Sequence, residues 1–274
     1  MIPRVRSAIF SGSFYPSEPL EIKRQIEDFL KEEKKVSPNT AIGCILPHAG
    51  YIYSGKVAAV TLAKVTIPEI VILLGPNHTG LGEAYSIVTE GVWKTPLGSV
   101  EIETNLARSF LRNCDYLKDD FLAHQQEHSL EVELPLLQYY RKDFKIVPFV
   151  FMSNDLTVLK QIGLQIAEVI RAKNYFKKVL FLASSDMTHY EPQKVAEAKD
   201  RKAISAILEL NEEELAVTVS ENDISMCGFA PVVVLLSAIK MLGARLGRLI
   251  LYQTSGDVTK DRDSVVGYAG IIFI

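Results

Sequence analysis

Apolar runs rich in β-branched residues recur along the chain and alternate with segments of helical periodicity. These runs predict strands at residues 41–46, 69–74, 145–151, 178–183, 248–253 and 264–274. Most of them are apolar on both faces, which is typical of strands buried between two helix layers. The segments between them predict helices at residues 19–33, 55–64, 127–141, 156–173, 193–210 and 230–242.

This alternation predicts an α/β fold in which a central, mostly parallel sheet is flanked by helices on both faces. Residues 85–103 interrupt the alternation of strands and helices, because Gly91, Pro96 and Gly98 separate short runs of alternating polarity. We expect a β-hairpin insertion there. A length of 274 residues would allow one large domain or two smaller ones. No repeat, low-complexity tract or long linker divides the sequence, so we expect a single domain over residues 1–274.

Composition and charge exclude several classes of function. The chain has 30 basic and 33 acidic side chains and no cluster of Lys and Arg, which argues against a nucleic-acid partner. Its three cysteines form no Cys-x-x-Cys pair and no disulfide framework, which favours a reducing compartment. The longest apolar stretch, 227–239, is shorter than the ~20 residues that span a bilayer. The N-terminus has too few apolar residues for a signal peptide. We therefore expect a cytoplasmic protein with no membrane partner.

Three of the five histidines directly follow predicted strands. His48, His78 and His189 come after the first, second and fourth of them. Ligands of parallel α/β sheets bind at the carboxyl ends of the strands, so we expect these side chains to share one site. Taken singly, each would be an ordinary solvated or capping histidine. Imidazole is both a common metal ligand and a general acid or base near neutral pH, and the spacing does not separate these roles.

The other two histidines, His124 and His128, are four residues apart. On a helix this spacing places both side chains on one face, as a metal site would require. The alternative interpretations are a position in the pocket wall, or a helix start with charged residues in its first turn.

Cys227 directly precedes the apolar helix predicted at 230–242. A helix N-terminus stabilises a thiolate, so Cys227 is the cysteine placed for chemistry, although a buried structural thiol is the alternative. Ser184 or Ser185, with Asp186 and His189, offers the residue types of a hydrolytic triad, but their closeness within one loop makes this a weak hypothesis. The sequence contains no dinucleotide-binding, P-loop, zinc-protease or nucleophile-elbow motif.

Several short motifs together resemble one known family. They are PHAGY at 47–51, GPNH at 75–78, EHSLE at 127–131, SSD at 184–186 with His189, and MCG at 226–228. In this order they resemble the Memo family, which includes the proteins called AmmeMemoRadiSam system protein B. The segments at 12–16 and 264–270 are also similar, so the resemblance covers essentially the whole chain.

The resemblance implies a fold similar to class III extradiol dioxygenases, which hold non-haem Fe(II) with two histidines and a carboxylate. Carried over by motif, His48 and His78 would be the histidine ligands and Cys227 the third metal ligand. His189 would occupy the acid/base position, with Asp186 beside it as a second catalytic candidate. We expect the pocket wall to include Tyr51, Asn77, His124 and His128. A thiolate is softer than a carboxylate, which favours copper(I), zinc or a more covalent iron site.

These observations lead to three hypotheses of function. The first is a metal-binding protein that uses iron, or copper, for redox chemistry with oxygen or a small organic ligand. The second is a non-catalytic adaptor that retains the pocket, with an AMMECR-type protein and a radical-SAM protein as the partners that the family name implies. The third is a zinc-dependent hydrolase that polarises water at the same site.

Overall fold

The apolar runs form one twelve-stranded sheet in the computed structural model, which describes residues 4–33 and 37–274. Residues 1–3, on which the expectation of no signal peptide partly depends, lie outside the described residues. The strands are β1 (Val5–Arg6), β2 (Gly43–Leu46), β3 (Ile70–Pro76), β4 (Tyr85–Ile87), β5 (Val92–Thr95), β6 (Gly98–Ile102), β7 (Lys118–Asp119), β8 (Lys145–Phe151), β9 (Val179–Ser184), β10 (His189–Glu191), β11 (Gly247–Thr254) and β12 (Val265–Phe273).

The strand order along the sheet is β1-β5-β6-β8-β3-β9-β2-β12-β10. Strands β8, β3, β9 and β2 run parallel in the centre, and β12 lies antiparallel to both β2 and β11. All seven residues of β3 are buried, because helices cover both faces of the sheet at this point. The predicted α/β class with a mostly parallel central sheet is confirmed.

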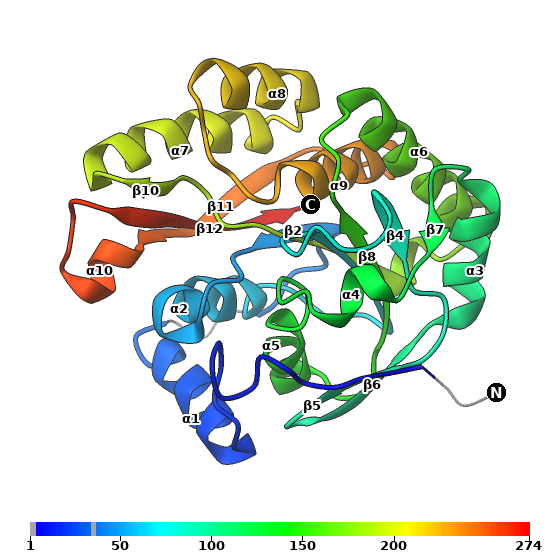
Figure 1. Cartoon of the computed structure of the whole chain (residues 1–274), viewed down its shortest axis with the longest axis horizontal. Coiled ribbons are helices and arrows are strands. Elements are labelled where there is room, and N and C mark those ends of the chain that lie inside the picture. The colour runs from blue at the N-terminus through cyan, green and yellow to red at the C-terminus, as the bar shows by residue number, and fades with distance from the viewer. Residues whose placement is uncertain (1–3, 34–36) are drawn as a thin grey trace.

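Helices lie above and below the sheet, which Figure 1 shows nearly edge-on. They are α1 (Pro19–Leu30), α2 (Tyr51–Leu62), α3 (Thr104–Asn113), α4 (Leu122–Gln125), α5 (Glu133–Tyr140), α6 (Leu156–Ala172), α7 (Gln193–Leu208), α8 (Glu212–Glu221), α9 (Phe229–Met241) and α10 (Ser255–Thr259), with a short 3₁₀ helix at Phe176–Lys178. Helices α1, α2 and α5 lie on one side of the sheet, and α6 to α9 lie on the other.

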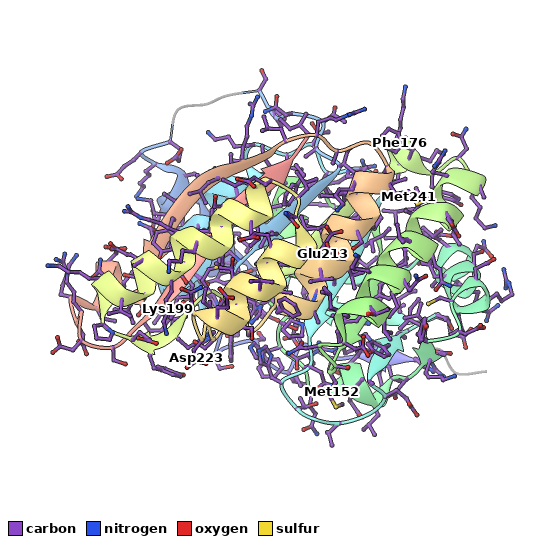
Figure 2. All side chains as sticks on the ribbon, turned by 90° about the horizontal axis from the view of Figure 1, so that it is seen from above. Met152, Phe176, Lys199, Glu213, Asp223 and Met241 are labelled. Atoms are coloured by element: carbon purple, nitrogen blue, oxygen red, sulfur yellow. The ribbon has the colours of Figure 1, made fainter. Side chains whose placement is uncertain are left out.

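Helix α9 is buried from Phe229 to Ile239, and these residues are almost all apolar. It packs on β3 and β9 and is itself covered by α6 and α8. The view in Figure 2 looks onto α7 and α8, where Glu213 of α8 forms an ion pair with Lys160 of α6. Among the described residues, no helix has both the length and the apolar character that crossing a membrane would take.

Two predicted elements differ from the structure. The hairpin is formed by β5 and β6 alone, while β4 pairs antiparallel with β8. Because β6 also pairs with β8, the whole region is part of the main sheet and is not a separate insertion. The helix predicted at 127–141 begins only at Glu133. The residues before it form a turn instead, because the carboxylates of Glu127 and Glu131 accept hydrogen bonds from backbone N–H groups of this turn and of other segments.

Helices α3 and α8 were not predicted. Helix α8 has a recognisable start, because the Asn211 side chain accepts a hydrogen bond from the backbone N–H of Glu214, as an N-cap residue does. Its glutamates then lie in the first turn, where the helix dipole favours negative charge.

Candidate metal centre

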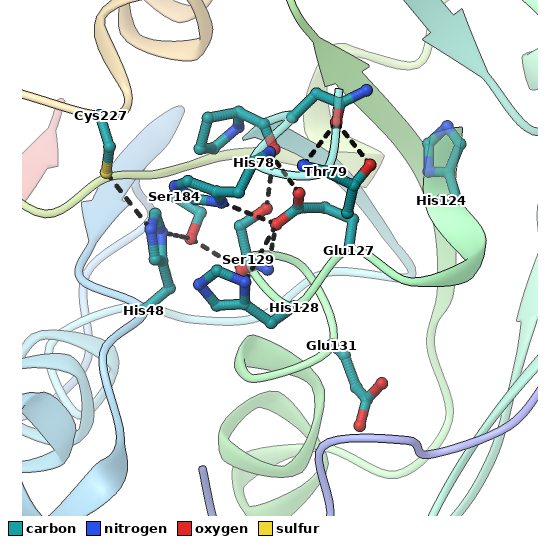
Figure 3. Close-up of polar contacts among 12 residues, drawn as sticks. His48, His78, Thr79, His124, Glu127, His128, Ser129, Glu131, Ser184 and Cys227 are labelled. Carbon is teal, nitrogen blue, oxygen red and sulfur yellow. Dashed lines mark hydrogen bonds and ion pairs between the residues drawn. The ribbon is translucent and has the colours of Figure 1, made fainter. Parts of the chain in front are cut away.

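The loops after β2, β3 and β9 open at the same edge of the sheet, because these three strands are parallel neighbours. His48 follows β2, His78 follows β3, and Cys227 lies two residues before the start of α9. One ligand atom from each of these three residues lies within 4.8 Å of the other two. The Sγ atom of Cys227 lies 3.3 Å from Nε2 of His48 (Figure 3). The structure therefore brings together the three residues that the family resemblance assigns as metal ligands.

Close packing holds Cys227 at this position. A Cβ atom on the next residue, Gly228, would lie 2.2 Å from Cβ of Ser185. The backbone N–H of Gly228 donates to Oγ of Ser185 at 3.1 Å, and the backbone N–H of Asp186 donates to the Cys227 sulfur at 3.2 Å. Glycine is needed here because the start of α9 approaches the loop after β9 so closely.

His48 is buried, and its ring is hydrogen-bonded through Nδ1, the nitrogen that does not face Cys227. Its Nδ1 lies 2.8 Å from Oγ of Ser184, the last residue of β9. Its backbone N–H donates to Oδ1 of Asp186 at 2.9 Å. Burial lowers the pKa of His48 well below its ordinary value, and the nearby histidines add to this effect. A neutral imidazole held through Nδ1 leaves Nε2 as the nitrogen for a metal.

His78 is held by a buried carboxylate. Its Nδ1 lies 2.9 Å from Oε1 of Glu127, and its backbone N–H donates to Oε2 of the same residue. Although burial opposes ionisation of Glu127, the hydrogen bond and charge of His78 help to lower the pKa of Glu127 to about 2. A carboxylate on the Nδ1 side is the usual way to orient a metal-ligating histidine.

His128 is a third histidine of the same cluster. Its ring stacks on that of His78 with the centroids 4.6 Å apart, and it lies 5.3 Å from the His48 ring. Its Nδ1 lies 3.3 Å from Oε1 of Glu127, so one carboxylate faces two imidazoles. Burial lowers the pKa of His128 to about 4, which keeps this ring neutral near pH 7. His128 therefore lies in the same cluster as His48 and His78.

Asp186 and His189 lie at the edge of this cluster. Burial raises the pKa of Asp186 to about 7, so this carboxyl group can change its protonation state near neutral pH. His189 is half-buried, and its Nδ1 lies 2.9 Å from the backbone oxygen of Ser225. Since a carbonyl oxygen only accepts, Nδ1 carries the hydrogen and Nε2 is free to accept a proton.

Burial dominates the chemistry of the Cys227 thiol. It raises the pKa of Cys227 well above the ordinary value, and the charge of Asp186 raises it further. This differs from our expectation that the helix N-terminus stabilises the thiolate, because the effect of a helix dipole is smaller than the cost of burying an unpaired charge. A bound metal cation would favour the Cys227 thiolate instead, since coordination deprotonates a thiol.

His124 does not belong to this cluster, which corrects our expectation. Helix α4 ends at Gln125, so His124 and His128 do not lie on one helical face. The His124 ring is fully buried against Trp93, with the ring centroids 6.0 Å apart, and Figure 3 shows it apart from the other histidines.

Tyr51 and Asn77 shape the surroundings of the site. The Tyr51 hydroxyl donates to the backbone oxygen of Val132 at 2.8 Å and so ties α2 to the turn before α5. Oδ1 of Asn77 accepts from the backbone N–H groups of Thr79 and Gly80, each at 3.0 Å, and builds the turn after His78. Both side chains support the loops that carry the donors.

The serine–aspartate–histidine arrangement is not a hydrolytic triad. The hydroxyl of Ser184 contacts Nδ1 of His48, and the hydroxyl of Ser185 contacts the backbone oxygen of Asp186. Among the hydrogen bonds of the described residues, neither hydroxyl reaches His189.

Sequence reasoning missed three buried glutamates in the segment 127–133. Each of them holds a different part of the site: Glu127 contacts His78, Glu131 pairs with Arg6 at 2.5 Å, and Glu133 lies 2.9 Å from the Ser184 hydroxyl. In the sequence, Leu130 and Val132 alternate with Glu131 and Glu133. This pattern does not by itself distinguish buried acids from a charged helix start.

The pair of Arg6 and Glu131 anchors the N-terminal segment over the cluster. Oε1 of Glu131 also accepts from the backbone N–H of Phe10 at 2.9 Å and from the Tyr15 hydroxyl at 2.7 Å. The rings of Phe10 and Phe14 pack against His128, with centroids 5.6 and 4.7 Å away. The N-terminal segment is therefore an aromatic wall of the site.

The donor set suits a metal ion. Two imidazoles that are each hydrogen-bonded through Nδ1, together with one thiol, match the nitrogen and sulfur ligands of zinc, copper and iron sites. The residue types do not select one of these metals.

Comparisons with known proteins agree with the motifs. A family model described as Memo-like protein matches residues 6–272. The chain is 43% identical over 280 residues to a MEMO1 family protein of Methanopyrus kandleri, with 98% of each chain covered. It is 41% identical over 286 residues to one of Methanocaldococcus jannaschii, which covers 98% of this chain and 99% of the relative.

Among solved structures, the crystal structure of an uncharacterised protein from Escherichia coli K12 is similar in fold. It aligns with a TM-score of 0.51 and 10% sequence identity, covering 84% of this chain and 98% of that one. The family model and the relatives together confirm the resemblance, and the chain belongs to the family of Memo-like proteins.

Proposed function

We propose that this chain binds a single metal ion through His48, His78 and Cys227 and uses it for redox chemistry. The observation that carries the proposal is the convergence of these three donors within 4.8 Å of one another. Iron is our first choice, with copper and zinc as alternatives, and the co-substrate is oxygen or a small organic ligand. Such a metal would supply electron transfer and open positions for these ligands.

The surrounding residues have supporting roles in this proposal. Ser184 and Glu127 hold the two imidazoles through Nδ1 and so keep each Nε2 available to the metal. His189 presents a free Nε2, which suits a general acid or base. The buried Asp186 carboxyl, with its pKa near 7, is a second group that holds or releases a proton close to the donors.

Metal reconstitution tests the proposal. The purified chain is incubated anaerobically with Fe(II), Cu(I) or Zn(II) in separate samples, desalted, and measured by elemental analysis. We expect stoichiometric metal in the native chain and loss of metal in Cys227→Ser. Cys114→Ser is the matched control, because Cys114 is a buried thiol at the end of α3 outside the donor group.

Two results would contradict the proposal. Trace metal in all three samples of the native chain would remove the metal site. Unchanged occupancy in Cys227→Ser would remove the thiolate from the ligand set. Zinc alone, with hydrolysis that is lost in His189→Ala, would favour the hydrolase instead.

A further inference from the structure

Strand β11 forms an open edge of the sheet. It pairs antiparallel with β12 along its whole length, and within the described part of the chain no strand pairs with its other side. In Figure 2 its orange ribbon runs along the outer side of the sheet. Helices α2 and α7 pack against β11. What remains open is therefore the row of backbone N–H and C=O groups along the outer side of this strand.

The sequence of β11 gives this edge little protection. Natural proteins usually protect an open edge with a short strand, with proline or with charged side chains. Strand β11 has eight residues, no proline, and a single charged residue, Arg248, near its start. The register with β12 shifts between Leu249 and Leu251, and this bulge is the one protective feature. The segment 249–254 is uncharged and mostly apolar, a composition that favours pairing with another strand.

Exposed apolar side chains flank both ends of the strand. Leu246 and Leu249 lie at its start, and Val258 of α10 lies beyond its end. Each of these side chains is between 40% and 49% exposed. In an antiparallel pair, the start of one strand lies beside the end of the other. Two copies of β11 paired in this way would bring the leucines of each copy towards Val258 of the other.

The charges at the two ends are also complementary. Arg245 and Arg248 are exposed at the start, where residues 243–248 include no acidic side chain. The turn at 255–263 beyond the end has three aspartates and two basic residues, and its Asp261 and Asp263 are exposed. None of these four exposed side chains forms an ion pair with another described residue. Antiparallel pairing would place arginines beside aspartates at both ends, whereas parallel pairing would place like charges together.

We propose that the open edge of β11 pairs antiparallel with β11 of a second copy of this chain around a twofold axis. Paired antiparallel strands exchange their N–H and C=O groups symmetrically, so one edge can complement itself under this symmetry. A second copy is the partner that the observations favour, because the apolar and the charged side chains at the two ends complement each other. The sheets of the two copies then form one continuous sheet. This inference does not depend on the metal site.

The oligomeric state of the full chain is the first measurement. Analytical ultracentrifugation over the micromolar concentration range should show a reversible equilibrium between monomer and dimer. Leu249→Lys adds a charge to the open edge and should leave the chain monomeric. Leu164→Lys is the matched control and should form the native dimer, because Leu164 is an exposed leucine of α6.

Charge reversal tests the antiparallel arrangement. The variant Arg245→Asp/Arg248→Asp and the variant Asp261→Arg/Asp263→Arg should each raise the dimer Kd by about 10-fold, because like charges then face each other. A chain with all four changes should recover the native Kd. An equimolar mixture of the two variants should form heterodimers for the same reason. Lys173→Asp/Lys177→Asp, which reverses two exposed lysines elsewhere, is the control and should leave Kd unchanged.

Hydrogen exchange locates the interface. Backbone amides of β11 should exchange more slowly in the dimer than in the diluted monomer. A native chain that stays monomeric, or forms oligomers larger than a dimer, overturns the inference. A dimer that ignores both Leu249→Lys and the charge reversals, or leaves exchange in β11 unchanged, forms through another surface and also overturns it. If Leu249→Lys does not fold, the charge reversals decide, because they change exposed side chains only.

Discussion

Glu127 binds His78 twice: Oε2 accepts its backbone N–H, and Oε1 lies 2.9 Å from Nδ1 of its ring. One carboxylate therefore orients both the main chain and the side chain of this histidine. The same Oε1 accepts the backbone N–H of Ser129 at 2.9 Å, which links the loop after β3 to the turn before α5.

Replacing Glu127 by Gln should weaken metal binding without removing a ligand. An amide has only one oxygen acceptor, so its NH₂ group would face an N–H donor and the His78 ring would lose its orientation. We expect Kd for the metal to rise by about 10–100-fold, measured by competition with a chelator. Glu212→Gln is the control, since Glu212 is a buried glutamate that contacts Ser237 and Lys240 away from the site. Equal affinity in both variants would contradict this role of Glu127.

Replacing Gly228 by Ala should displace Cys227. The added methyl group would lie 2.2 Å from Cβ and 2.4 Å from Oγ of Ser185, so the start of α9 must move. We expect reduced metal occupancy by elemental analysis while the circular dichroism spectrum stays native. Gly50→Ala is the control at the same site, because the nearest atom to its methyl group would be the backbone oxygen of Phe14 at 3.6 Å. Equal occupancy in the two variants would refute the packing argument.

Breaking the buried ion pair of Arg6 and Glu131 should destabilise the fold. Arg6→Met leaves the Glu131 carboxylate buried without its cation, which typically costs about 3–5 kcal/mol in free energy of unfolding. The double variant Arg6→Met/Glu131→Met should lose less than the sum of the single losses, because it leaves neither charge unpaired. Urea unfolding of the native chain and the three variants measures this coupling. Strictly additive losses would show that the two side chains act independently.

His124 should make stability depend on pH. Burial, and then the charge of Arg6, lowers the pKa of His124 from 6.5 to about 3. Between these values the unfolded chain binds a proton that the folded chain does not. The stability contribution is therefore complete above about pH 6.5 and is lost as the pH falls towards 3.

His124→Phe removes this titration while keeping an aromatic ring against Trp93. In metal-free protein, the difference in free energy of unfolding between the variant and the native chain should be constant above pH 7. Below pH 6 it should change by about 1.4 kcal/mol per pH unit in favour of the variant. If the free energies of unfolding of the native chain and of His124→Phe change in parallel down to pH 4, His124 is protonated in the folded protein.

The fold and part of the site follow from local patterns in the sequence. Uninterrupted apolar runs determine buried parallel strands, and such strands place His48 and His78 at one edge of the sheet. The motif around Cys227 added the third donor through the family resemblance. These features depend on residues close together in sequence, and for that reason they were predictable.

Only the tertiary structure decided the roles of the three acids in the segment 127–133. Glu127, Glu131 and Glu133 have the composition of a charged helix start, yet their partners His78, Arg6 and Ser184 lie 49, 125 and 51 residues away along the chain. The tertiary structure also decided the position of His124, because its separation from His128 depends on where α4 ends. Buried polar groups must find hydrogen-bond partners wherever the fold supplies them, and this requirement is satisfied in three dimensions rather than along the sequence.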